Sequence, residues 1–221
     1  ERHERGAAIA APKAISLKRP EIKTHHTGGS TVGRREETRH YHYSTGLAGW
    51  IGKFWKNGVA SNVTDGTKSC YTYDAIMTAS NDKYIVGVEW DASGFTSNAK
   101  LWVNGVMTDI TGLSFLNSTA TGVFVNGTDV YVSYDMDDLS TGYSSARLWK
   151  NGTSITLSDN TANFHAKCVY VSGSDVYVGG VRTPPASIVS RAVIWKNGIA
   201  QYLNNGQFNS IVTKILVNGT D

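Results

Sequence analysis

The chain has 221 residues, of which 18% are charged, 23 are glycine and 2 are cysteine. Two cysteines exclude a disulfide-dense scaffold and a four-thiolate zinc site, because both need more thiols than the chain holds. No apolar run approaches the roughly 20 residues of a membrane-spanning helix, so we expect no transmembrane segment.

The first stretch of the chain, residues 1–43, has a composition unlike that of the rest. Residues 1–45 hold 9 Lys and Arg against 5 Asp and Glu, whereas the remainder holds 12 basic against 13 acidic residues. The basic residues are scattered and lack interleaved aromatics, so we expect no nucleic-acid partner. We expect residues 1–43 to be an atypical basic segment, disordered or not native to the protein, and residues 44–221 to carry the fold.

Four copies of a tryptophan-containing hairpin follow at a nearly constant spacing. Each copy ends in Trp-Lys-Asn-Gly or a close variant, and the tryptophans are 47, 47 and 46 residues apart. Asn-Gly between two short apolar runs indicates a β-hairpin, because a type I′ turn needs positive φ at both central residues. The tryptophans are Trp55, Trp102, Trp149 and Trp195.

A second hairpin lies between consecutive tryptophan hairpins. It reads Val-x-Val, a turn with Gly and Asp, then Val-Tyr-Val, at residues 123–132 and 169–178. A weaker copy covers 77–86, and a partial copy covers 215–221. An aspartate recurs at the turn, where we expect it to bond local backbone N–H groups rather than to do chemistry. These aspartates are Asp129, Asp175 and Asp221.

Two hairpins per unit give four antiparallel strands every 46–47 residues, which predicts an all-β fold and specifically a β-propeller. Leu148 and Trp149 are neighbours, so they point to opposite faces of a strand, and a sheet that is apolar on both faces needs cover on both. A β-solenoid is less favoured, because its coils are shorter and need no paired hairpins. Counting hairpins predicts about three and a half blades, as in a fragment of a larger propeller.

The two signatures, Trp-Lys-Asn-Gly and Asp-Val-Tyr-Val followed by Gly, recur in phase. In this respect residues 44–221 resemble a family of secreted bacterial β-propeller repeats. The copies depart from the pattern at Val103, which replaces the lysine, and at Lys83-Tyr-Ile-Val86, which replaces Asp-Val-Tyr-Val. The resemblance implies the propeller fold, and it transfers no catalytic residues.

Two tryptophans fall outside the repeat phase. The in-phase tryptophans are expected to pack between blades, whereas Trp50 and Trp90 lie near loops and are the better candidates for contacts with a ligand. Asp91 follows Trp90 directly and is assigned to the same candidate ligand site.

An acidic cluster falls in what the repeat pattern marks as a variable loop. Its members, Asp135, Asp137 and Asp138, are the candidate metal ligands, because calcium takes clustered carboxylates on flexible loops. The run lacks the spaced ligands and closing Glu of a calcium loop, so a solvated loop is favoured. Calcium is the one cofactor that the sequence suggests.

His165 and Cys168 are the only nearby histidine and cysteine in the repeat region. A spacing of three residues on a strand places them on opposite faces, so we expect a histidine at a loop end and a buried cysteine rather than a dyad. Cys70 is expected to remain unpaired as well. No nucleophile elbow, phosphate loop or zinc-helix motif appears, and no catalytic residue is assigned.

We interpret the chain as part of an exported bacterial protein, located outside the cell or at its surface. Low charge and abundant Ser, Thr, Asn and Gly are associated with such β-domains. The favoured function is a non-catalytic binding or scaffolding module for a protein or glycan ligand. The alternative is a fragment of a propeller-fold hydrolase or lyase whose catalytic residues lie in other blades.

Overall fold

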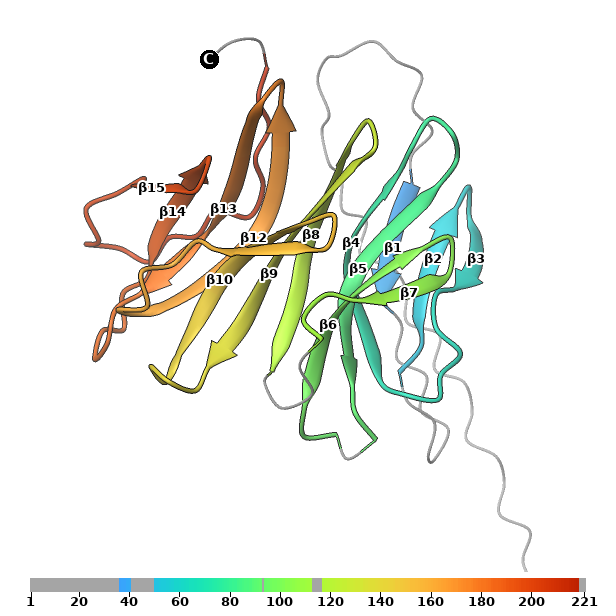
Figure 1. Ribbon diagram of the computed structural model, residues 1–221, viewed down its shortest axis with the longest axis horizontal. Helices are drawn as coiled ribbons and strands as arrows, with labels where there is room; N and C mark the ends of the chain where they lie inside the picture. Colours follow the sequence, from blue (N-terminus) through green and yellow to red (C-terminus); the bar gives the residue numbers. More distant parts are fainter. Residues whose placement is uncertain (1–35, 41–49, 93, 113–116, 219–221) are drawn as a thin grey trace, which may run out of the picture. The chain divides into compact units, whose positions relative to one another are not determined.

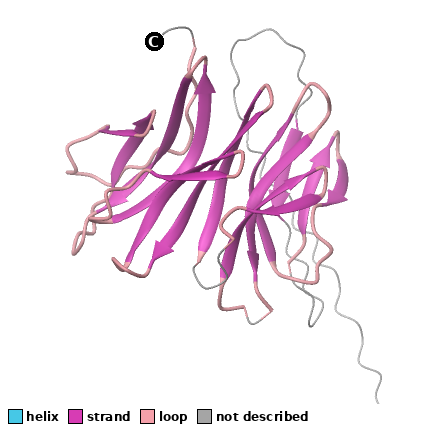
Figure 2. Ribbon diagram, in the orientation of Figure 1, coloured by secondary structure: helices cyan, strands magenta, loops and turns pink. Residues whose placement is uncertain are grey.

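The computed structural model describes residues 36–40, 50–92, 94–112 and 117–218. Within these ranges the chain forms strands and turns and no helix (Figures 1 and 2), and none of the described segments is a helix that could cross a membrane. All described residues belong to one unit, residues 34–221. The expected all-β class is confirmed.

The described strands form one three-stranded and three four-stranded antiparallel sheets, each ordered as in the sequence. Sheet I holds β1 (Glu36–His40), β2 (Gly52–Lys56) and β3 (Val59–Asn62). Sheet II holds β4 (Cys70–Met77), β5 (Lys83–Trp90), β6 (Ser97–Val103) and β7 (Val106–Asp109). Sheet III holds β8 (Ser118–Asn126), β9 (Asp129–Asp138), β10 (Tyr143–Lys150) and β11 (Thr153–Thr156). Sheet IV holds β12 (Asn163–Ser172), β13 (Asp175–Thr183), β14 (Arg191–Lys196) and β15 (Ile199–Tyr202).

Strand β1 lies inside the atypical segment 1–43 and pairs with β2, with Glu36 opposite Lys56 and His40 opposite Gly52. The remainder of that segment lies outside the described residues. The expectation that residues 1–43 are disordered or not native therefore stays a prediction.

The Asn-Gly turns have the backbone geometry that the sequence predicts. In all four hairpins both central residues have positive φ, for example 46° at Asn151 and 95° at Gly152. Gly adopts positive φ without a steric clash because it has no Cβ. Among the other residues, Asn and Asp adopt this backbone conformation most readily. The turn residues therefore fix the register of β10 with β11, and of the matching pairs in the other sheets.

Two of the recurring aspartates, Asp129 and Asp175, have a different role from the one expected, and Asp221 lies outside the described residues. Asp175 at the start of β13 accepts a hydrogen bond from Asn197 Nδ2 at 2.8 Å and pairs with Lys196 Nζ at 2.8 Å. Asn197 Oδ1 in turn accepts the backbone N–H of Val176. The aspartate therefore joins two hairpin turns of one sheet instead of capping its own turn. Asp129, Lys150 and Asn151 repeat the arrangement in sheet III.

The in-phase tryptophans of sheets II–IV each pack against the preceding sheet, and the leucines next to them in sheets II and III pack against the following sheet. Trp149 lies in a buried cluster with Val86 and Leu101 of sheet II, whereas Leu148 lies in a cluster with Trp195 of sheet IV. Trp102 likewise packs with Phe54 of sheet I. The prediction of sheets that are apolar on both faces is thus confirmed by their shared cores.

The first strand of every four-stranded sheet has a β-bulge at the same place in the repeat. The register shifts between Thr72 and Asp74, between Ala120 and Gly122, and between Ala166 and Cys168. A bulge inserts one unpaired residue and redirects its side chain. The inserted residues are Tyr73, Thr121 and Lys167.

The chain after β15 returns along sheet IV as an extended segment. Ser210 donates its backbone N–H to the Ser190 carbonyl, and Val212 donates to the Gly180 carbonyl. Val212 is buried, whereas Leu216 is exposed. The segment therefore lies against sheet IV much as β12 lies against sheet III, and it brings Thr213 to the position that matches Lys167 one repeat earlier.

Truncating a tryptophan between two sheets should destabilise the protein far more than truncating Trp90. Trp102 and Trp149 are 2% and 8% exposed, whereas Trp90 is half-buried. We expect Trp102→Ala and Trp149→Ala to lower the free energy of unfolding by about 3–5 kcal/mol, and Trp90→Ala to lower it much less. Urea denaturation measures all three, and an equal loss for Trp90→Ala would contradict this assignment.

The turn-bridging aspartates should make stability depend on pH. Hydrogen bonds from Lys196 and Lys150 lower the pKa of Asp175 and Asp129. A carboxyl whose pKa is lowered by folding stabilises the fold above its unfolded pKa, and this contribution is lost as the pH falls through the folded pKa.

The double variant Asp129→Asn/Asp175→Asn should therefore be less stable than the wild type at pH 7 but lose less stability on acidification below about pH 4. Denaturant titrations across this range measure the difference. Each single variant should give part of the effect, because the two turns lie in different sheets. Parallel pH profiles of the wild type and the double variant would refute the prediction.

Candidate functional site

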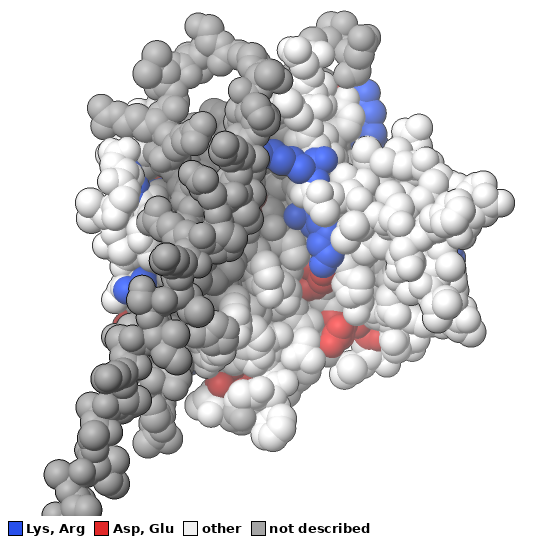
Figure 3. Space-filling view, turned by 180° about the vertical axis from the view of Figure 1, so that it is seen from behind, with Lys and Arg blue, Asp and Glu red and all other residues white. Residues whose placement is uncertain are grey.

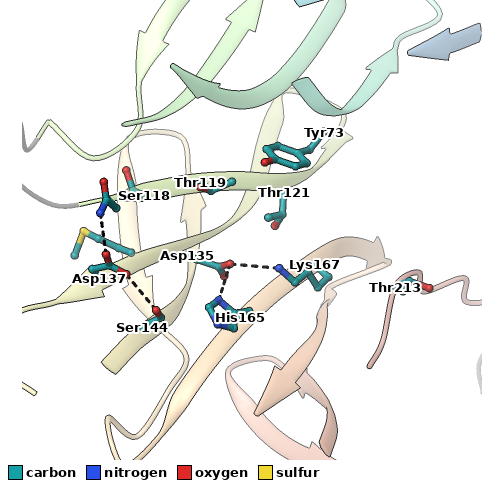
Figure 4. Close-up of a pocket in the computed structure, with 12 residues that line it drawn as sticks. Tyr73, Ser118, Thr119, Thr121, Asp135, Asp137, Ser144, His165, Lys167 and Thr213 are labelled. Atoms are coloured by element: carbon teal, nitrogen blue, oxygen red, sulfur yellow. Dashed lines mark hydrogen bonds and ion pairs between the residues drawn. The ribbon is translucent and has the colours of Figure 1, made fainter. Parts of the chain in front are cut away.

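A cavity of about 540 Å³ lies where strands β4, β8, β9 and β12 come together with the segment around Thr213 (Figure 4). Every lining residue except Met136 has a polar side chain. The polar lining residues are Tyr73, Asn117, Ser118, Thr119, Thr121, Asp135, Asp137, Ser144, His165, Lys167 and Thr213. A cavity with this lining offers many hydrogen-bonding groups beside the carbon atoms of the same side chains.

The bulges of the first strands aim their inserted side chains at this cavity. Tyr73, Thr121 and Lys167 all line it, and Thr213 joins them from the extended segment. These four residues are 48, 46 and 46 positions apart, so they are the same position in successive repeats. They also line a second cavity of about 370 Å³, which further includes Asp74, Cys168 and Lys214. These four side chains therefore line both cavities.

Asp135 has three polar partners around the first cavity. It is only 9% exposed, and its Oδ1 accepts the backbone N–H of Ala166 at 2.6 Å. Its Oδ2 lies 3.1 Å from His165 Nδ1 and 3.6 Å from Lys167 Nζ. Burial of a carboxylate is tolerated when N–H donors and a cation surround it, which is the case here. Figure 4 shows the His165 and Lys167 side chains reaching Asp135 from β12.

Thr121 helps to hold the bulge of β12 in place. Its hydroxyl donates to the Ala166 carbonyl at 2.9 Å, and Asp135 takes the N–H of the same residue. The backbone on one side of the Lys167 bulge is thus bonded to sheet III through both of its polar groups. This positions His165 and Lys167, which flank Ala166, toward the cavity.

The acidic cluster of the sequence lies in strand β9 and not in a loop, which corrects the expectation. Asp137 lines the cavity and accepts hydrogen bonds from Asn117 Nδ2 at 3.2 Å and from Ser144 Oγ at 3.1 Å. Asp138 bonds Ser140 in the following turn, and these hydrogen bonds lower its pKa. Among the described residues no three His, Cys, Asp or Glu side chains are grouped as metal ligands, and calcium binding stays a prediction.

His165 differs most from what the sequence led us to expect. It is the third residue of β12 rather than the end of a loop, and its half-buried ring lines the cavity. A bulge follows Ala166, so the simple alternation of side chains does not hold between His165 and Cys168. Cys168, which follows the bulge, lines the second cavity.

The candidate aromatic residues are brought together by Tyr71. The ring centroids of Trp50 and Tyr71 are 4.8 Å apart, and those of Tyr71 and Trp90 are 5.2 Å apart. Asp91 organises the next loop, because its carboxylate accepts the hydroxyl of Thr96 at 2.5 Å and the N–H of Phe95 at 3.2 Å. Trp50 and Trp90 are half-buried, so both contribute to packing at this end of sheet II.

Charged side chains gather in part of the surface. Figure 3 shows basic side chains above acidic ones in a band along the middle of that face, beside largely uncharged surface. Basic and acidic side chains thus lie close together on this face.

The second cavity contains weakly acidic groups. Burial raises the pKa of the Asp74 carboxyl, whose Oδ2 accepts the backbone N–H of Val123 in sheet III. Burial also raises the pKa of the Cys168 thiol to about 11 and that of the Cys70 thiol to about 12. Both cysteines are free, as the sequence predicts.

Sequence reasoning missed Asp135 as a partner of His165, although a signal for it was present. At the equivalent position sheets II and IV have Val88 and Val181, which are buried like Asp135. A single carboxylate in a series of core valines marks a position where one sheet carries chemistry that the others lack. His165 is singular in the same way, because Tyr71 and Thr119 occupy its position in the preceding sheets.

No family model and no curated protein shows a significant match to the chain. Among solved structures, the chain is similar to a fucose lectin from Kordia zhangzhouensis, solved with methyl-fucoside, with a TM-score of 0.45 and 9% identity over 62% of this chain and 98% of that chain. It is similar to a Pyrococcus horikoshii acylaminoacyl peptidase with a TM-score of 0.45 and 12% identity over 77% of this chain and 25% of that chain. Likenesses at this level carry no argument about function.

Neither thiol should react in the folded protein at neutral pH. The raised pKa values of Cys70 and Cys168 keep both as thiols, and the thiolate is the reactive form. We expect no alkylation by iodoacetamide at pH 7 without denaturant and two alkylations in urea, read as mass shifts. Rapid modification of Cys168 in the native protein would show that the second cavity activates this thiol.

Proposed function

We propose that this protein is an extracellular, non-catalytic binding module that takes a glycan in the cavity around Asp135. The observation that supports it most is the lining of that cavity. Ligand pockets usually have only a few polar groups, whereas all but one of the lining residues here have a polar side chain. Hydroxyl, amide and carboxylate side chains in this density suit a ligand that is itself covered in hydroxyl groups.

The proposed architecture is a β-propeller of the secreted bacterial repeat family. Sheets II, III and IV would be its blades, with the bulged strands β4, β8 and β12 nearest the axis. Two features support this: tryptophan clusters that join successive sheets, and the equivalent bulge residues that meet at one cavity. In this arrangement the cavity lies on the axis of the propeller, where residues from several blades converge.

A glycan fits better than a protein ligand as the occupant. A protein surface would need a broad contact patch, whereas the polar groups here converge into a hollow of about 540 Å³, the size of a small ligand. Asp137 shows how such a ligand would be held. Its carboxylate is already bonded to Asn117 and Ser144, which fixes its orientation while further acceptor sites remain on its oxygens.

Binding is tested by a screen of the protein on a glycan array, with two matched variants. Asp137→Asn changes a carboxylate that lines the cavity, whereas Asp138→Asn changes its neighbour, which bonds Ser140 in the turn. We expect Asp137→Asn to weaken glycan binding by about tenfold or more and Asp138→Asn to leave it unchanged. Thermal melts of both variants control for folding.

Three outcomes are informative. Binding that is lost only in Asp137→Asn supports the glycan site. Equal losses in both variants would move the binding surface away from the cavity. If the wild type binds no glycan on the array, the glycan proposal fails.

A second candidate function rests on one contact. Asp135 bonded to His165 Nδ1 is the pairing that prepares an imidazole for general base catalysis. A hydrolase or lyase acting on glycans could use it. We expect such an enzyme to release new reducing ends from a polysaccharide panel and to lose this activity in His165→Gln. A pure binding module would release none.

A further inference from the structure

We infer that His165 selects the ligand of this cavity by presenting the lone pair of Nε2, so that the site takes neutral sugars that donate a hydroxyl hydrogen bond. The inference rests on the glycan-binding function proposed above. It adds to that function a substrate class, neutral rather than acidic sugars, and a residue that determines specificity.

The tautomer of His165 follows from its partner. Asp135 already accepts the N–H of Ala166 and faces the Lys167 ammonium, so its carboxylate acts as an acceptor. The ring nitrogen that lies 3.1 Å from Asp135 Oδ2, Nδ1, must then carry the hydrogen and donate it. A neutral imidazole with its hydrogen on Nδ1 has a lone pair on Nε2.

The Nε2 atom is available to a ligand. Within the described part of the chain no hydrogen bond to it is present, and it is not among the buried polar atoms that lack a partner. The His165 side chain is 35% exposed and lines the cavity. A hydroxyl group of a ligand in the cavity can therefore donate a hydrogen bond to His165 Nε2.

The charges around His165 disfavour an acidic ligand. The titratable groups that share the cavity are Tyr73 from β4, Asp135 and Asp137 from β9, and Lys167 from β12. Strands β8 and β10 contribute only Ser and Thr side chains, and β13 places Val181 opposite His165. The one ammonium is already paired with Asp135, which leaves Asp137 without a cation in the cavity. An anionic sugar would be repelled by the Asp137 carboxylate, and its own carboxylate could not donate a hydrogen bond to His165 Nε2.

The substitution Asp135→Asn tests the tautomer with little change of shape. The new amide oxygen can keep the N–H of Ala166, and the amide nitrogen then faces His165 Nδ1 as a donor. This forces the imidazole hydrogen onto Nε2, so the nitrogen that faces the cavity changes from a hydrogen-bond acceptor to a donor.

Asp135 is a positioning residue in this scheme, and His165 makes the contact with the ligand. Asp137→Asn is the matched control, because it removes the other carboxylate of the cavity without touching His165.

The first measurement is the ¹⁵N NMR spectrum of the imidazoles, which needs no ligand. The His165 signals are identified by their loss in His165→Gln. We expect an N–H signal for Nδ1 and a lone-pair signal for Nε2 in the wild type and in Asp137→Asn, and the reverse in Asp135→Asn. A wild type with a hydrogen on Nε2, either alone or together with one on Nδ1, would overturn the inference and leave the glycan proposal standing.

The second measurement is binding of the methyl glycosides of glucose, galactose, mannose and fucose, of their single deoxy analogues, and of the methyl glycosides of the matching uronic acids. We expect one deoxy position to weaken binding to the wild type by about tenfold, and to have no further effect in Asp135→Asn. Uronic acids should bind more weakly than the neutral sugars. Equal deoxy effects in both proteins, or tighter binding of uronic acids, would refute the inference. If the tautomer is as expected and none of these sugars binds, the glycan proposal fails and the donor requirement fails with it.

Discussion

The packing of apolar side chains between successive sheets is the constraint on which the other features depend. Every four-stranded sheet has apolar residues on both faces, so none can be stable in water alone. The tryptophan of one sheet and the neighbouring leucine, such as Trp149 and Leu148, serve two different interfaces. Because this packing brings the sheets together, their first strands converge, and the cavity forms where they meet.

The repeat could be predicted from the sequence because its signals are local. Asn-Gly turns, alternating Val and Tyr, and the phase of the tryptophans each report on a few neighbouring residues, and the strands follow them closely. The bulges could not be predicted, because the extra residue at Lys167 has no local signal and is stabilised by contacts of Ala166 with sheet III. The candidate site depends on these bulges, so most of it was missed as well.

The sequence pointed to other residues than those at the centre of the cavity, and the role of Trp50, Trp90 and Asp91 in ligand binding stays a prediction. Trp50 and Trp90 stood out because they fall outside the repeat phase, and in the structure both are half-buried and in contact with Tyr71. Asp135 was noticed only as one of three adjacent acidic residues. Its partner His165 is 30 positions away, and nothing in the spacing of two residues on different sheets reports that they touch. A comparison of equivalent positions between repeats would have exposed both.

The bulge separates the residue that faces the cavity from the apolar residues that pack between the sheets. Tyr73, Thr121, Lys167 and Thr213 occupy one position in four successive repeats, yet they are an aromatic, two small alcohols and a cation. The positions directly before the first three of them, Thr72, Ala120 and Ala166, are buried and small. A lineage that duplicates this unit can therefore vary its ligand through substitutions at one position per copy, while the interfaces that give the fold its stability are left unchanged.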